Sequence, residues 1–151
     1  MKRTIVRTVL LLLLILPCAA AAGENLDNLD ATALAQLETK ASHASPREQS
    51  FLYTELVHVY SQLASRQLTA GDVDQAQVTL KKIQDYIGRI QSGLTRDAKK
   101  LKNAEMLLES ARFRMGQLAH RVSTEDQPAV TATLQQIDKV HEQMLAQVFA
   151  H

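Results

Sequence analysis

Two stretches of the chain decide its fold: residues 73–94, VDQAQVTLKKIQDYIGRIQSGL, and residues 101–122, LKNAEMLLESARFRMGQLAHRV. In each stretch an apolar residue recurs at alternating spacings of three and four without a miss. The first set is Val73, Ala76, Leu80, Ile83, Ile87, Ile90 and Leu94, and the second is Leu101, Ala104, Leu108, Ala111, Met115, Leu118 and Val122. This spacing places each set on one side of an α-helix. We therefore expect two long helices, each with a continuous apolar seam.

The boundaries of these and the other helices follow from local signals. The apolar phase slips near Ser92-Gly93, with Thr95 as a possible cap, which predicts a turn; without it the two stretches form one rod of about 50 residues, roughly 75 Å long. Ser45-Pro46-Arg47-Glu48 is a capping box with proline at the first helical position. It predicts a helix that runs to about Ala70 and ends at Gly71.

Three further signals complete the expected fold. Asp72 can cap the helix that follows it, and a shorter first helix is expected over about 27–44. The segment from Ser123 to Pro128 closes one helix and opens a fifth, whose apolar stripe is Val130, Leu134, Ile137, Met144 and Val148. Two adjacent apolar stripes on the helix after Ser45 place it centrally, between the first helix and the rest. The predicted fold is all-α, an antiparallel bundle of four long helices plus a shorter N-terminal one.

The first 22 residues have the pattern of a secretory signal peptide. Lys2, Arg3 and Arg7 precede an unbroken apolar run over 9–16, and Ala19 to Ala22 offer an Ala-x-Ala exit before Gly23. The run is too short to span a bilayer, which needs roughly 20 residues. We expect cleavage near Ala22 and a secreted or periplasmic protein whose single helical domain covers residues 23–151.

Removal of this leader changes the composition of the working chain. The remaining 129 residues carry 14 Lys and Arg against 16 Asp and Glu and no cysteine. A nearly neutral chain has no global attraction to nucleic acid, and packing without disulfides must hold the fold. The only cysteine, Cys18, follows Pro17, where a bacterial lipobox has a small residue. We therefore expect plain cleavage rather than lipidation at Cys18.

Residues 57–90 resemble a single tetratricopeptide repeat, a helix–turn–helix unit of about 34 residues. Tyr60 stands at a large aromatic position, Leu63-Ala64 at a Leu-Gly pair, and Gly71-Asp72 at the turn. Gln67 and Ile83 depart from the pattern, and a shift of one repeat length in either direction finds no second copy. The resemblance therefore implies a local helical hairpin and not a repeat array. As a whole the chain resembles small secreted bacterial helical proteins.

Two histidines raise the question of a metal or cofactor. Glu55-x-x-His58 matches one element of a di-iron bundle, but the chain has no second copy, and helical projection turns His58 toward water. His141 falls within the apolar stripe of the fifth helix. It is either a core or boundary histidine satisfied by one hydrogen bond or an axial ligand of a non-covalent haem. In a hairpin about residue 124, His141 lies level with Leu108 and roughly 10 Å from Met115, which disfavours a His–Met pair.

A basic segment and an apolar pair are the candidate interaction surfaces. Residues 81–102 contain seven basic side chains: Lys81, Lys82, Arg89, Arg96, Lys99, Lys100 and Lys102. A turn near Gly93 gathers many of them at one end of the bundle, as a solvated end or a contact for anionic lipid. Met106 and Phe113 lie seven residues apart on the side of their helix away from its seam. The first helix covers them, or they form a partner or dimer surface.

The residue patterns exclude the common catalytic sets. The sequence has no recognisable Ser/His/Asp or Cys/His set and no glycine-rich phosphate loop. We expect a non-catalytic module, without cofactor or metal, that binds an envelope or secreted protein or a second copy of itself. The alternative is a small-ligand or b-type haem carrier centred on His141, and an anionic membrane surface is a further partner to test.

Overall fold

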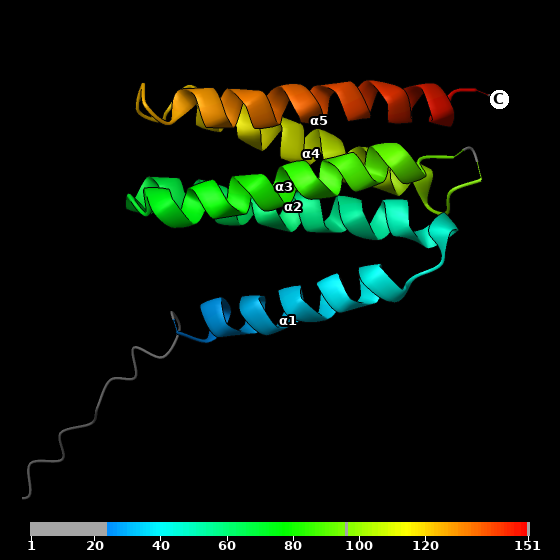
Figure 1. Cartoon of the computed structure of the whole chain (residues 1–151), viewed down its shortest axis with the longest axis horizontal. Coiled ribbons are helices and arrows are strands. Elements are labelled where there is room, and N and C mark those ends of the chain that lie inside the picture. The colour runs from blue at the N-terminus through cyan, green and yellow to red at the C-terminus, as the bar shows by residue number, and fades with distance from the viewer. Residues whose placement is uncertain (1–23, 96, 151) are drawn as a thin grey trace, which may run out of the picture.

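The computed structural model describes residues 24–95 and 97–150 of the chain. The expected signal peptide and Arg96 lie outside these residues. The described part is all-helical and consists of α1 (Glu24–His43), α2 (Pro46–Ala70), α3 (Val73–Gly93), α4 (Leu101–Ala119) and α5 (Gln127–Val148). The predicted all-α bundle is confirmed (Figure 1). Helix α1 begins at Glu24 and has 20 residues, so it is shorter than α2, α3 and α5 but one residue longer than α4.

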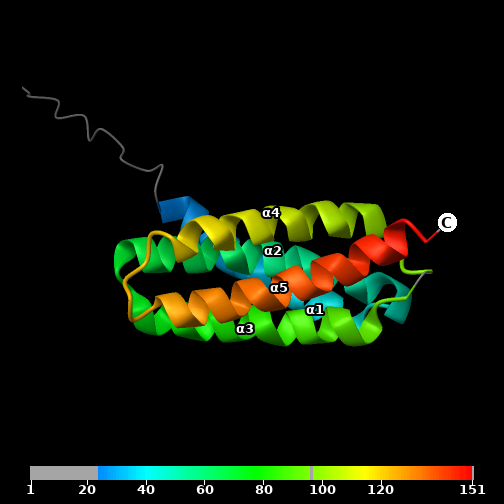
Figure 2. The same cartoon turned by 90° about the horizontal axis from the view of Figure 1, so that it is seen from above.

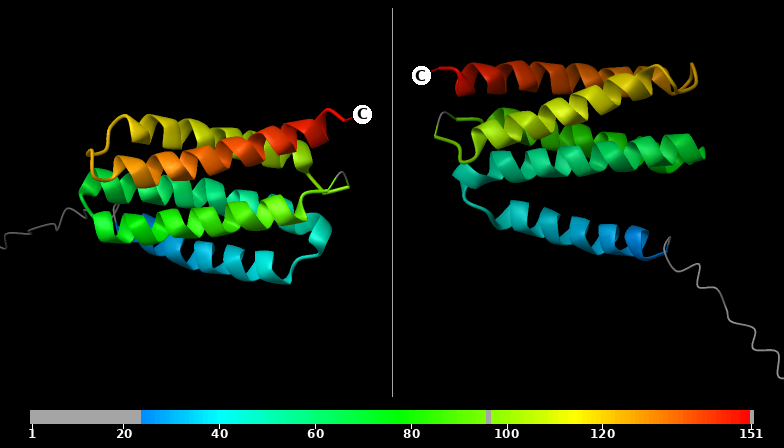
Figure 3. Two further views of the ribbon diagram at one scale, coloured as in Figure 1. Left: turned by 45° about the horizontal axis from the view of Figure 1, so that its top comes forward. Right: turned by 180° about the vertical axis from the view of Figure 1, so that it is seen from behind.

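Four of the helices close a ring, and the remaining one lies outside it. Helix α2 packs on α3 and α4, and α5 packs on the same two helices from the other side. The backbone of α1 lies against α2, and its Glu38 side chain also reaches Tyr86 and Lys82 of α3. Figures 1 and 3 show the result as layers, with α1 on one side of the α2–α3 pair and the α4–α5 pair on the other. Seen from above in Figure 2, the helices run nearly parallel along the long axis of the molecule.

The core is built from the two predicted seams. Ala76, Leu80, Ile83, Ile87 and Ile90 of α3 are buried, as are Ala104, Leu108, Ala111, Met115 and Leu118 of α4. The end positions of both seams are half-buried. Helix α2 is central, as expected, because its buried residues (among them Leu52, Leu56, Val57 and Ala64) face both α1 and the ring. Packing of apolar side chains without disulfides is therefore the main source of stability.

The α1–α2 and α2–α3 connections are set by local sequence. Pro46 occupies the first turn of α2, and the Ser45 hydroxyl donates to the Glu48 carboxylate at 2.8 Å. The predicted capping box is not completed, because the Ser45 side chain makes no cap hydrogen bond to the backbone and bonds the Glu48 side chain instead. Gly71 ends α2 with φ 82°, and the backbone N–H groups of Gly71 and Asp72 donate to Leu68 and Gln67. This is a Schellman ending, which needs the left-handed glycine. The predicted cap bond from the Asp72 side chain is absent.

The turn between α3 and α4 is present, so the two helices are separate rather than one rod. Helix α3 ends at Gly93, as the phase slip predicts, and α4 begins at Leu101. The connecting loop is fastened to the start of α2: the Lys99 amide donates to the Arg47 carbonyl at 2.8 Å, and the Arg47 side chain pairs with Asp97 at 3.1 Å. The expected cap at Thr95 does not form; its hydroxyl bonds Asp97 within the loop.

Candidate binding surfaces

The outer face of α4 carries an exposed apolar pair. Met106 is 63 % exposed and Phe113 is 64 % exposed. Of the two sequence-based alternatives, cover by the first helix is wrong, because α1 packs on α2, on the opposite side of the α2–α3 layer. Lys102 and Arg121 are exposed at either end of the pair. Two large apolar side chains in solvent on one line of a helix are typical of a contact surface.

The two acidic side chains of α4, Glu105 and Glu109, are engaged with partners on α4 and α5. Glu105 and Glu109 are half-buried, and their carboxylates lie 3.0 and 3.4 Å from Nε2 of His141. Arg112 donates two hydrogen bonds to Glu109, at 2.6 and 2.9 Å, and reaches Asp138 of α5 at 3.6 Å. The hydrogen bond from Arg112 holds the pKa of Glu109 below its ordinary value. The side chain of Glu105 is therefore largely covered, at 19 % exposure, whereas that of Glu109 is paired but remains 43 % exposed.

His141 is a boundary residue with a carboxylate partner. Its side chain is 12 % exposed and lies between Glu105 and Glu109, which flank Leu108. This agrees with the predicted level of His141 beside Leu108. A haem iron would need a ring nitrogen of this histidine, but the Nε2 atom is already occupied by the Glu105 carboxylate. No observation on the structure favours a cofactor at His141.

The described side chains of the basic segment have different neighbours. Lys82 pairs with Glu38 of α1 at 3.1 Å, and Lys99 pairs with Glu48 of α2 at 2.9 Å. The Arg89 guanidinium lies 5.7 Å above the Tyr53 ring, and the Lys100 ammonium lies 4.7 Å above the Phe51 ring. Lys102 is exposed on α4. Most of the described members of the segment are therefore engaged by side chains of other helices.

His58 also differs from its predicted orientation. Instead of pointing to water, its half-buried ring faces α4, and its pKa is lowered by burial and by the nearby charge of Arg114, while the Leu107 backbone acts in the opposite direction. Its Nε2 atom lies 2.8 Å from the amide of Gln62. Helical projection failed here because α4 covers the flank of α2 outside the main apolar stripe. No cluster of three or more potential metal-ligating side chains occurs in residues 24–95 and 97–150.

All three tyrosines of the protein form one stacked column between α2 and α3. Tyr86 of α3 lies between Tyr53 and Tyr60 of α2, with ring centroids 5.7 and 5.8 Å away. A cation ends the column on each side: Arg89 over Tyr53, and Lys82 at 5.1 Å from the Tyr60 centroid. Cations attract the negative faces of aromatic rings, so the two ends reinforce the stack.

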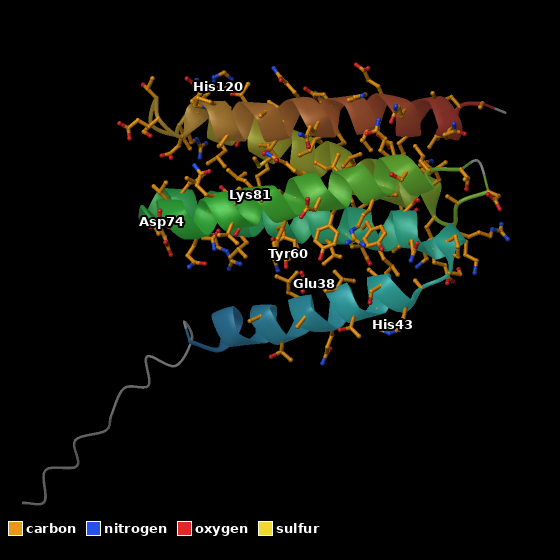
Figure 4. All side chains as sticks on the ribbon, in the orientation of Figure 1. Glu38, His43, Tyr60, Asp74, Lys81 and His120 are labelled. Atoms are coloured by element: carbon orange, nitrogen blue, oxygen red, sulfur yellow. The ribbon has the colours of Figure 1, made fainter. Side chains whose placement is uncertain are left out.

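Glu38 of α1 fastens this column from outside, and Figure 4 shows it facing Tyr60 across the gap between α1 and α2. Its Oε1 atom accepts hydrogen bonds from the hydroxyls of Tyr60 and Tyr86, the latter at 2.9 Å, and from Lys82 at 3.1 Å. Burial alone would raise the pKa of the Glu38 carboxyl, but these three hydrogen bonds and the charge of Lys82 together lower it. We call Glu38, Tyr60, Tyr86 and Lys82 the α1 latch.

Sequence reasoning missed the tyrosine column and the α1 latch because their members are distant along the chain. Tyr53 and Tyr60 are seven residues apart, as are Lys82 and Arg89 with Tyr86 between them. These spacings place each set on one helix face. That the two faces meet depends on the relative rotation of α2 and α3, which neither spacing specifies.

Comparison with known proteins identifies no relative of this chain. None of the helices in the described part of the chain is both long and apolar enough to cross a bilayer. No protein-family model matches the sequence, and neither the curated proteins nor the solved structures searched contain a similar chain.

Proposed function

We propose that this protein is a non-catalytic interaction module that works outside the cytoplasm and binds a protein partner through the outer face of α4. The observation that carries the proposal is the exposed pair Met106 and Phe113, at 63 and 64 % exposure on a helix whose other face is packed into the core. The leader-like sequence of residues 1–22 supports the location.

The charges around the pair indicate the chemistry of the partner. Lys102 and Arg121 flank it, whereas the carboxylates of α4 are engaged with His141 and Arg112. A partner with an apolar strip bordered by acidic side chains would complement this face. In a second copy presenting the same face, the Glu109 carboxylate of α4 is already paired with Arg112, so a different protein with free acidic side chains fits better than self-association.

Site-specific photo-crosslinking in the producing cells tests the proposal directly. A photoreactive phenylalanine analogue at position 113 is expected to give a discrete protein adduct, and the same analogue at Val78 serves as the control. Val78 is also a large exposed apolar residue, at 55 %, but lies on α3. Equal adducts at both positions, or none at position 113, would contradict the proposal.

Two measurements separate this partner from the others. In sedimentation, a monomer at micromolar concentration excludes stable self-association through this face. A dimer that Phe113→Ser abolishes would mean that the partner is a second copy of the chain. Binding to anionic vesicles that depends on Phe113 and weakens with salt would replace it by a membrane surface. Mass spectrometry of the mature N-terminus tests the location: cleavage near Ala22 supports it, and an acylated Cys18 would place the module on a membrane.

A further inference from the structure

A pocket lies beside the α1–α2 connection and shares no residue with the α1 latch. It has a volume of about 430 Å³ and is formed by the end of α1, the start of α2 and the last loop residues before α4. Its apolar lining comes from Ala44, Phe51 and Leu52, of which Leu52 is 4 % exposed and the other two are half-buried. This volume lies within the range of small-molecule sites, which is typically about 300–1,000 Å³. We call it the hinge pocket.

Two lysines place positive charge at this apolar surface. The Lys100 ammonium is held 4.7 Å above the centroid of the Phe51 ring, and Lys40 lines the pocket from α1. Neither forms an ion pair with a carboxylate of residues 31–95 or 97–150. The third lysine of the pocket, Lys99, is different, because Glu48 neutralises it at 2.9 Å.

The balance of the remaining charges selects the ligand. Once the Lys99–Glu48 pair is set aside, Lys40 and Lys100 stand against a single carboxylate in the lining, that of Glu55. One net positive charge beside an apolar surface complements a monoanion with an apolar body, and a dianionic phosphate would leave one charge uncompensated. A short polar anion would not use the Phe51 and Leu52 surface.

We propose that the hinge pocket binds a single-chain aliphatic carboxylate, with its head group between Lys40 and Lys100 and its chain along Phe51. This function is separate from the α4 outer face, since the pocket and that face lie on different helices. It also differs from a haem site at His141, because the ligand contacts lysines and an aromatic ring at the α1–α2 hinge.

Titration calorimetry with decanoate below its micellar concentration tests the chemistry of the ligand. Decanoate is expected to bind, and decanol, which lacks the charge, should bind several-fold more weakly. Hexanoate should also bind more weakly, because each methylene buried against the pocket tightens binding by about twofold to fourfold. No binding of decanoate at millimolar concentration, or equal affinity for decanol, would overturn the proposal.

Substitutions test the two lysines. Lys100→Asn removes the charge and suits the left-handed backbone at this position, where φ is 56°. This variant and Lys40→Gln should each raise the Kd of decanoate about threefold, as expected for exposed ion pairs. Lys81→Gln is the matched control, an exposed lysine of α3 outside the pocket. Equal affinities of the Lys100→Asn, Lys40→Gln and control variants would overturn the assignment.

Amide chemical shifts separate this pocket from the exposed apolar pair on α4. Decanoate should shift the backbone signals of Ala44 and Phe51. Shifts confined to the neighbourhood of Met106 and Phe113 would mean that the alkyl chain adsorbs on the α4 outer face, and the hinge pocket would then not be the site.

Discussion

Removal of the Glu38 carboxylate should release α1 from the bundle without unfolding the rest. Glu38 is the single acceptor for the hydroxyls of Tyr60 and Tyr86 among the described residues, and it also pairs with Lys82. Helices α2 to α5 close their ring without α1, which lies against α2 and reaches α3 through Glu38. Glu38→Ala should therefore act on the docking of α1 and leave the ring nearly unchanged.

The magnitude follows from which groups lose a partner. Tyr60 is 3 % exposed, and a buried hydroxyl without an acceptor costs about 1–3 kcal/mol. Tyr86 is half-buried and Lys82 is exposed, so water can replace Glu38 as their partner. We expect a total loss of about 2 kcal/mol in α1 docking, which corresponds to roughly 30-fold faster amide exchange. Glu38→Gln keeps one acceptor oxygen and should lose about half as much.

Hydrogen exchange read by mass spectrometry is the appropriate assay because it reports each helix separately. Peptides from α1 should lose protection in Glu38→Ala, whereas those from the cores of α3 and α4 should not. Gln36→Ala, an exposed substitution on the same helix, is the control and should leave α1 protection unchanged. The reasoning is refuted if α1 exchange is the same in both variants, or if the core helices lose protection together with α1.

Four other outcomes follow from the structure. The folded-state pKa of Glu38 lies below the ordinary value of 4.5, so its carboxylate stabilises α1 docking above pH 4.5. This stabilisation should be lost as the pH falls through the folded-state pKa. Near-ultraviolet tyrosine dichroism should show the transition in the parent chain and not in Glu38→Gln. Ile83→Ala, at a fully buried site, should cost about 2–5 kcal/mol in urea unfolding, and Val78→Ala, at 55 % exposure, less than about 0.5 kcal/mol; comparable losses would contradict the assigned core. Lys100→Gly should raise the free energy of unfolding by about 0.5–1 kcal/mol by relieving the left-handed backbone at φ 56°, and a lower melting temperature would count against this. Haemin added to the purified protein should give no Soret shift that depends on His141, since the Glu105 carboxylate occupies its Nε2 atom, and a shift lost in His141→Ala would restore the haem carrier.

The parts of the structure that the sequence predicts correctly are those that depend on one helix at a time. The seams of α3 and α4, the ending at Gly71 and the break at Gly93 each follow from a pattern within one short segment. Cap bonds were predicted less well: the Asp72 side chain makes none, because the Schellman ending of α2 already uses the Asp72 amide.

The errors arise where one helix covers another. His58 was placed in water because projection on α2 shows the apolar stripe but not the helix that covers its flank. The ion pairs of Lys82 and Lys99 with Glu38 and Glu48 of other helices do not follow from the pattern of any one helix. The sequence also does not decide whether Phe113 is exposed. That depends on which helix α1 packs against, and the α1 sequence does not specify this.

The sequence by itself determined that this chain forms helices with apolar seams, where those helices stop, and that a leader-like segment precedes them. Local periodicity and turn chemistry are sufficient for these features, because each is a property of consecutive residues. Only the tertiary structure decided that three tyrosines stack beneath Glu38, that the α4 carboxylates turn to His141, and that Met106 and Phe113 stay in solvent. These contacts depend on the rotation and axial position of one helix against the next, which are set by packing of the whole core.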